Sequence, residues 1–414
     1  MDIISLIETV VPSAYSGTDI EIDRAACIGV NRTRNYCRLC ADICPQQAIT
    51  FHKSTQISLD HDACSHCGAC LTVCPVQAVR SHWLDDERLY ARLAGGSTLL
   101  LCEPAAECLK TAGAEPEGMV TVLECLDRLD EAQLLYLLVL GDGQVDLVTE
   151  NCSTCAIGCD FGMSELICEY TTAIIDALGV NAAVRAHRVS AKTLNEVLPV
   201  LASSRPLRAL SSSPVVSAEG EVDRREAFSA LKTQALGIFS RVATQATSEF
   251  LEASLGQGAS LARVEQTPES QPPPFRQEMA RRCLLTLLDA AADPAACVDL
   301  AADTTGCDTE GGRDTNKGSA AQLPSRLWGY PHVNPQKCVK CKVCSTLCPM
   351  QAITQVRVGA RVTGLDIRPW RCVQCGRCAA ACAHKAIRIQ QLVPADLILK
   401  QRTVAERFVA TAAS

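Results

Sequence analysis

Cysteine dominates the residues of this chain that could do chemistry. The chain has 414 residues, 26 of them cysteine, and 16 of these fall into four runs of similar spacing. Two runs read C-x2-C-x2-C-x3-C-P, a third has Ala383 in place of the proline, and a fourth has nine residues between its first two cysteines. In chain order the runs are Cys27, Cys37, Cys40 and Cys44; Cys64, Cys67, Cys70 and Cys74; Cys338, Cys341, Cys344 and Cys348; and Cys372, Cys375, Cys378 and Cys382. Thiolates at this spacing hold [4Fe–4S] clusters, so the sequence predicts four of them.

The runs occur in two pairs, and this pairing predicts the ligand sets. Three thiolates of one run reach three irons of a cluster, and the fourth cysteine ligates the cluster of the partner run. The backbone amides of each tight loop point at the sulfides and stabilise their negative charge. The expected sets are site I, with Cys27, Cys37, Cys40 and Cys74; site II, with Cys64, Cys67, Cys70 and Cys44; site III, with Cys338, Cys341, Cys344 and Cys382; and site IV, with Cys372, Cys375, Cys378 and Cys348.

The spacing argues against the other sites that cysteines form. Zinc ribbons use C-x2-C pairs but not this run, and the sequence lacks the C-x3-C-x2-C order of radical enzymes that use S-adenosylmethionine. A disulfide scaffold is not expected, because the first residues do not read as a signal peptide. The long first run leaves two alternatives open: a three-iron cluster, or a displaced Cys27.

All four runs also end alike. Alanine and a branched residue follow the last cysteine at 48–49, 78–79, 352–353 and 386–387, which marks an internal repeat. On these motifs, each pair of runs resembles the two-cluster ferredoxins of bacteria. The resemblance implies a βαββαβ fold around two neighbouring clusters, and the short apolar segments at 48–51 and 56–59 fit its hairpin.

A different pattern lies between the two pairs. Segments 97–102, 119–124 and 144–149 read as short buried strands, and segments 130–140 and 164–178 have helical apolar spacing. This alternation predicts a small α/β domain. Its cysteines follow the expected strands, where ligands bind in α/β sheets.

This central region resembles the delta subunit of the hydrogenases that supply heterodisulfide reductase. The matching residues are Cys102 after the first strand, Cys125 to Asp130 after the second, and Cys152 with Cys155 after the third. The resemblance implies a [2Fe–2S] cluster that passes electrons between a catalytic subunit and a disulfide-reducing or flavin partner. The family has two closely spaced cysteines after the first strand. This chain differs there, because the next cysteine after Cys102 is Cys108, six positions on.

We therefore expect a fifth cluster, [2Fe–2S] or [4Fe–4S], at a central site formed by Cys102, Cys125, Cys152 and Cys155. The alternative is that Cys102 and Cys125 are buried core thiols, a common place for free cysteine.

Composition and motifs together predict an α+β protein in five parts. Residues 1–90 and 329–414 are the two ferredoxin-like dicluster modules, the second with a C-terminal helix. Residues 91–180 are the central α/β domain, 181–265 a helical segment, and 266–328 a flexible linker with a short helix. The sequence has no apolar run long enough to span a membrane. We expect a cytoplasmic protein, either free or held at the cytoplasmic face of a membrane through partner subunits.

Basic residues concentrate in the C-terminal pair of runs. Residues 331–390 contain ten Lys and Arg and one acidic residue, Asp366, a net charge of +9, although the whole chain carries −7. One interpretation is a docking face for an acidic redox partner. The alternative is that these side chains only offset the negative charge of the clusters.

The expected function is electron transfer. The sequence shows no Rossmann fingerprint, P-loop, flavin or molybdopterin motif, so we expect a relay subunit of a hetero-oligomeric oxidoreductase complex. Its partners would be a catalytic subunit, such as a hydrogenase, formate dehydrogenase or flavoprotein, and an electron acceptor. Two alternatives remain: an enzyme that reduces a disulfide or persulfide at the central cysteines, and an iron–sulfur sensor or assembly factor.

Overall fold

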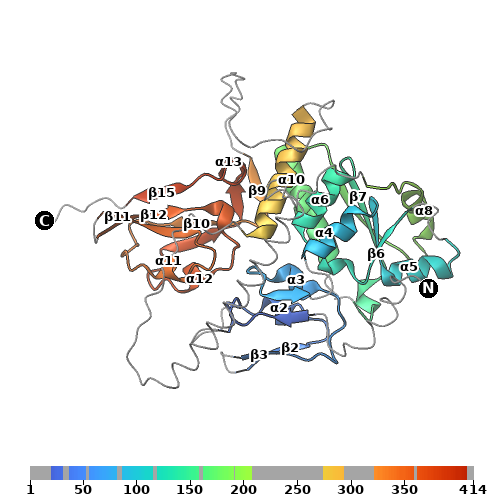
Figure 1. Cartoon of the computed structure of the whole chain (residues 1–414), viewed down its shortest axis with the longest axis horizontal. Coiled ribbons are helices and arrows are strands. Elements are labelled where there is room, and N and C mark those ends of the chain that lie inside the picture. The colour runs from blue at the N-terminus through green and yellow to red at the C-terminus, as the bar shows by residue number, and fades with distance from the viewer. Residues whose placement is uncertain are drawn as a thin grey trace, which may run out of the picture. The chain divides into compact units, whose positions relative to one another are not determined.

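Figure 1 shows the computed structural model of the chain. The structure describes residues 20–30, 37–52, 56–81, 86–114, 119–157, 162–190, 192–207, 274–292, 321–358 and 361–407. All of them belong to one unit, comprising residues 1–210 and 272–414. Most of the segment expected to be helical and most of the expected linker lie outside the described residues. No helix in the part of the chain that the structure describes is both long and apolar enough to cross a membrane.

The N-terminal module has the element order that the ferredoxin resemblance implies. Its elements are β1 (Ile20–Ile22), α2 (Leu39–Asp42), β2 (Ile49–His52), β3 (Gln56–Leu59), α3 (Ala69–Val73) and β4 (Val79–Ser81). β1 pairs with β4, and β2 with β3, both antiparallel. The apolar strand residues Ile20, Ile49 and Ile57 are buried beside the cysteines, so strands and cysteine loops share one core.

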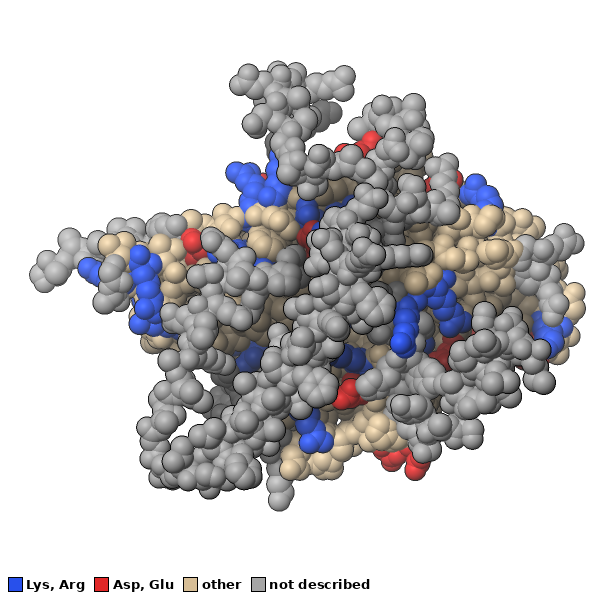
Figure 2. All heavy atoms as spheres, viewed as in Figure 1, with Lys and Arg blue, Asp and Glu red and all other residues tan. Residues whose placement is uncertain are grey.

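The C-terminal module repeats this order. It contains β10 (Tyr330–Val333), α11 (Val343–Leu347), β11 (Ile353–Val358), β12 (Arg361–Ile367), α12 (Arg377–Ala380) and β13 (Ile387–Gln390). β14 (Leu392–Pro394) pairs with β9 (Gln322–Pro324). The expected C-terminal helix is α13 (Ala395–Leu399), after which β15 (Val404–Arg407) extends the β11–β12 sheet. Lys and Arg side chains outnumber acidic ones on the visible face of this module (Figure 2).

The central domain is built on a parallel sheet with the strand order β6-β5-β7-β8. The strands are β5 (Leu99–Cys102), β6 (Thr121–Leu123), β7 (Gln144–Thr149) and β8 (Ala183–Arg188). The helices are α4 (Asp86–Ala94), α5 (Glu103–Thr111), α6 (Glu131–Leu140), α7 (Met163–Leu178) and α8 (Leu194–Ala202). α6 is apolar around most of its circumference and is correspondingly buried. The carboxyl ends of parallel strands meet at one edge, and this edge carries the central cysteines.

Two sequence expectations need correction. Residues 183–188 form strand β8, which pairs with β7, so the helical segment expected from 181 begins as a strand, and the central domain continues past 180. β8 is an edge strand with Val184 as its one fully buried residue, which explains why hydrophobic patterning missed it. The short helix expected within the linker is the 18-residue α10 (Phe275–Ala292).

Helix α10 joins three parts of the described unit. Met279, Ala280 and Leu284 are buried on it, and it packs against α6. Its Arg276 donates from Nη1 to the carbonyl of Leu71 in α3 (2.9 Å) and pairs through Nε with Asp130 (2.9 Å). Gln277 donates to the carbonyl of Leu327, ahead of β10 (3.0 Å). α10 therefore ties the central domain to both modules.

Candidate metal centres

Left-handed residues shape the cysteine loops. His66 (φ 60°) and Gly68 (φ 78°) flank Cys67 of site II. Sites III and IV repeat the pattern with Lys340 and Lys342, and with Gln374 and Gly376. Alternating right- and left-handed backbone turns successive N–H groups toward one point and creates a concavity for anions. This geometry suits loops that surround the sulfides of a cluster.

The repeated alanine after each fourth cysteine also has a physical role. Its backbone N–H donates to the sulfur four residues earlier, from Ala78 to Cys74 (3.2 Å), from Ala352 to Cys348 (3.1 Å) and from Ala386 to Cys382 (3.3 Å). The residue before each alanine is left-handed and tightens this turn. Such N–H donors stabilise a charged sulfur, and they are among the contacts that tune iron–sulfur centres.

The structure brings together the four cysteines predicted for site I. Cys40 is the buried residue of α2, and Cys74 directly follows α3 as its C-terminal cap. Burial raises the pKa of Cys40 to about 12, and the thiols of Cys74, Cys37 and Cys27 add to that rise. Cys27 and Cys40 belong to one core cluster, and Cys37 and Cys74 pack against it, so the four thiols lie as one group. The long insertion of the first run does not separate Cys27 from the others.

Site II shows the same convergence. Burial raises the pKa of Cys70 strongly, and nearby Cys67, Cys40, Cys64 and Cys44 raise it further. Three of these belong to the predicted set, and Cys40 belongs to site I. The two sites of the N-terminal module are therefore neighbours, as expected for exchanged fourth cysteines.

In the C-terminal module, all four cysteines of site III line a single pocket. At site IV, burial raises the pKa of Cys372, with added contributions from Cys348, Cys378 and Cys375. Cys378 is in addition influenced by Cys344 of site III, and one apolar cluster contains or contacts cysteines of both sites. Sites III and IV are therefore adjacent.

The central cysteines also converge. Cys102 ends β5 and precedes α5, while Cys125, Cys152 and Cys155 border the short 3₁₀ turns after β6 and β7. Burial raises the pKa of Cys152 to about 11, followed by the effects of Asp127, Cys102 and Cys155. Burial likewise raises the pKa of Cys125, and Cys102 contributes. The sheet edge thus gathers four thiols from three loops.

Sequence reasoning did not single out Asp127. It is buried (1% exposed) and accepts a hydrogen bond from the backbone N–H of Ser164 at the start of α7 (2.9 Å). Its charge contributes to the raised pKa of Cys67 in site II and of two central cysteines, Cys125 and Cys152. A carboxylate therefore lies between site II and the central site. In the sequence, the position of Asp127 two residues after Cys125 was the one feature that could have pointed to it.

Hydrogen bonds connect the central domain to the loop of site II. Ser65, between two cysteines of that loop, donates to the carbonyl of Ile157 (2.8 Å), and Gln46 donates to the carbonyl of Ala156 (3.1 Å). Thr72 of α3 donates to the carbonyl of Asp127 (2.8 Å). The Cβ of an alanine at Gly68 would lie 2.5 Å from the Cβ of Arg128. The two sites are thus held against each other by close backbone approach.

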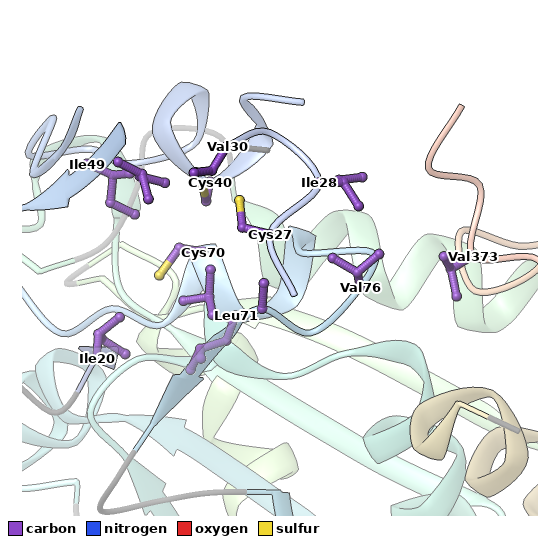
Figure 3. Packing of buried hydrophobic residues seen from close by; sticks show 13 residues of the cluster. Ile20, Cys27, Ile28, Val30, Cys40, Ile49, Cys70, Leu71, Val76 and Val373 are labelled. Carbon is purple, nitrogen blue, oxygen red and sulfur yellow. The ribbon is translucent and has the colours of Figure 1, made fainter. Parts of the chain in front are cut away.

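An apolar contact connects site I to site IV. Val373, between two residues of the fourth run, is buried (3% exposed) within the same cluster as Ile28 and Val76 of the N-terminal module (Figure 3). Met350 and Cys375 pack against this cluster. Cys37 of site I is close enough to Cys375 of site IV to contribute to its raised pKa, after burial and the nearer groups.

Other cysteines stand apart from these sites. Cys283 is buried on α10, and burial raises its pKa to about 12. Cys168 is buried on α7. Cys159, Cys297 and Cys307 lie outside the described residues. Among the described residues, no group of His, Cys, Asp and Glu side chains is arranged to hold a single metal ion. The thiolates of a cluster bind different irons and stand farther apart than the ligands of one ion.

Comparison with known proteins identifies the two ends of the chain. The family of the 4Fe–4S dicluster domain matches residues 34–78 and 337–386. No curated protein and no solved structure matches the chain. The chain therefore carries a dicluster domain toward each end, and its central region is unassigned. Two such domains imply four [4Fe–4S] clusters and electron transfer. Of the expected ligands of sites I to IV, only Cys27 lies outside the matched segments.

Proposed function

We propose that this chain is an electron-transfer subunit that relays single electrons between partner subunits of a larger cytoplasmic oxidoreductase complex. Each [4Fe–4S] cluster takes up or releases one electron when bound. The cysteines at sites I to IV would give every iron a thiolate ligand, which leaves no open iron for bond chemistry. The role of the protein is then to hold the clusters close together, exclude water and set their potentials.

The observation that carries the proposal is the contact of site I with site IV through Val373. Together with the other neighbouring pairs, it supports one series: central site, site II, site I, site IV and site III. Electron tunnelling slows exponentially with distance, so a relay needs each site beside the next. Without this contact, the two modules would be separate carriers.

The central site is proposed as the fifth member of the series, holding a [2Fe–2S] or [4Fe–4S] cluster. Four converging thiols support this assignment, and so does their contact with site II. The rival function, direct reduction of a disulfide, needs a nucleophilic thiolate of lowered pKa. Burial instead raises the pKa of Cys152 to about 11. A free Cys152 thiol would therefore be a poor nucleophile.

Spin–spin interaction between reduced clusters tests the series. Full-length protein is purified without oxygen and reduced, and the relaxation of each paramagnetic cluster is measured by electron paramagnetic resonance. The variant C37S/C40S removes site I, and the variant C341S/C344S removes site III as a matched control. In both variants the three remaining clusters of sites I to IV should hold about 12 irons.

We expect the site IV signal to relax more slowly after site I is removed, because it loses one of two neighbours. Removal of site III should have a comparable effect on site IV, while leaving sites I and II unchanged. A site IV signal that is indifferent to the loss of site I would refute the series.

A further inference from the structure

We propose that the loop of site III is the docking face for an acidic, one-electron carrier protein. This inference rests on the proposed function and names one of its partners. The docking face consists of Lys337, Val339, Lys340, Lys342 and Val343, which surround the exposed Cys341.

Site III is the exposed end of the proposed series. Cys341 is exposed, whereas Cys67, at the equivalent place in site II, is buried. Helix α11 contains no buried residue, but α3 buries four of its five. The difference arises because the central domain covers α3, while the loop of site III faces solvent among the described residues. A partner that exchanges electrons needs such close access to a cluster.

The repeats supply an internal comparison for the lysines. Lys337, Lys340 and Lys342 occupy the positions held by Ala63, His66 and Gly68 in the loop of site II. Cluster ligation therefore does not require a basic side chain at these positions. The three lysines give the loop of site III a positive charge, and the covered loop of site II has no lysine at the equivalent positions.

Lys342 carries a conformational cost that glycine avoids. Its φ is +69°, close to the values of Gly68 and Gly376 at the equivalent positions. A side chain in this left-handed region is less favourable than glycine, which has no Cβ to clash with the backbone. Lys342 thus adds a positive charge to an exposed loop at a position where glycine would suit the backbone better.

The docking face has the composition of an interface. Val339 and Val343 are exposed by 53% and 38%, and lysines flank them in the sequence. His384 lines the same pocket as these residues, and Lys385 beside it is exposed. An apolar centre with a charged rim suits transient recognition, and the positive sign selects an acidic partner.

The opposite end of the series has a different character. Glu103 and Glu107 are exposed on α5 beside the central site and line a groove there with Lys110. Glu124 is also half exposed. An acidic carrier is therefore attracted to site III rather than to the central site.

The test uses an acidic flavodoxin as the probe. Its binding to the full-length, cluster-loaded protein is measured by surface plasmon resonance at low and high salt. The test variant is K337E/K340E/K342E. The control is K110E/K192E/K400E, which changes the net charge equally at exposed lysines elsewhere. Five of the six lysines are exposed and Lys340 is half-buried, so unchanged iron content and absorption spectra verify that both variants are intact.

We expect the test variant to bind at least about tenfold more weakly than the wild type at ~20 mM salt, with the difference shrinking to under about threefold at ~500 mM salt. The control should bind like the wild type. Equal weakening by both variants, or binding by the wild type that does not respond to salt, would overturn the docking face. The spin-relaxation experiment tests the proposed series separately from this binding assay. The docking face can be refuted while the series of sites is supported, and the series can be refuted while the docking face is supported.

Discussion

The buried ion pair between Arg276 and Asp130 provides a quantitative test of how the described unit is held together. The side chains are 9% and 2% exposed, and their nitrogen and oxygen are 2.9 Å apart. Asp130 also caps α6 by accepting from the backbone N–H of Gln133 (3.0 Å). The perturbation is Arg276→Met, which keeps much of the side-chain volume and removes the charge.

The variant leaves a buried carboxylate without its cation and the Leu71 carbonyl without its donor. Breaking a buried ion pair from one side costs about 3–5 kcal/mol, and the unsatisfied carbonyl adds about 1 kcal/mol. We therefore expect the free energy of unfolding to fall by ~4 kcal/mol or more. The double variant R276M/D130N should recover about half of the loss, because it no longer buries an unpaired charge.

The assay is urea unfolding without oxygen, followed by circular dichroism of the cluster-loaded protein. Arg402→Met is the matched control, since its ion pair with Asp396 (3.0 Å) is largely exposed and should contribute less than about 1 kcal/mol. A loss under about 1 kcal/mol for R276M, or a double variant less stable than the single, would refute the reasoning.

Two further predictions concern the contacts between sites. Asp127→Asn removes a negative charge beside site II and the central site, so it should raise their potentials by ~50–100 mV in a spectroscopic redox titration. The potentials of sites III and IV should stay constant, and an equal shift at all sites would contradict this placement. Val373→Asp buries a charge at the contact between the modules and should abolish the spin interaction of sites I and IV, with iron content retained. The same substitution at Val358, which is 71% exposed, should leave that interaction intact.

Much of the metal chemistry could be predicted from the sequence. Cysteine spacing is a local property, and exchange of the fourth cysteines follows from it, so sites I to IV could be grouped before any fold was known. The recurring alanine indicated an internal repeat. The hydrogen bond from its backbone N–H to the cysteine sulfur four residues earlier explains why the same turn recurs.

The arrangement of the sites could not be predicted in the same way. Ser65 and Ile157 are 92 positions apart, and Val76 and Val373 are farther apart still, so no local pattern links them. Periodicity missed β8 because, apart from Val184, its side chains are at most partly buried. α10 was expected to be shorter than it is, although its buried residues and Arg276 join three regions.

Iron and acid-labile sulfide per chain, measured on full-length protein purified without oxygen, test the central claim most directly. Four [4Fe–4S] clusters with a cluster at the central site predict about 18 or 20 irons per chain, and the variant C125S/C155S should lower the value to about 16. A wild-type value near 16 that the variant leaves unchanged would remove the central site from the series. A value near 8 or below would contradict the four clusters of the two modules.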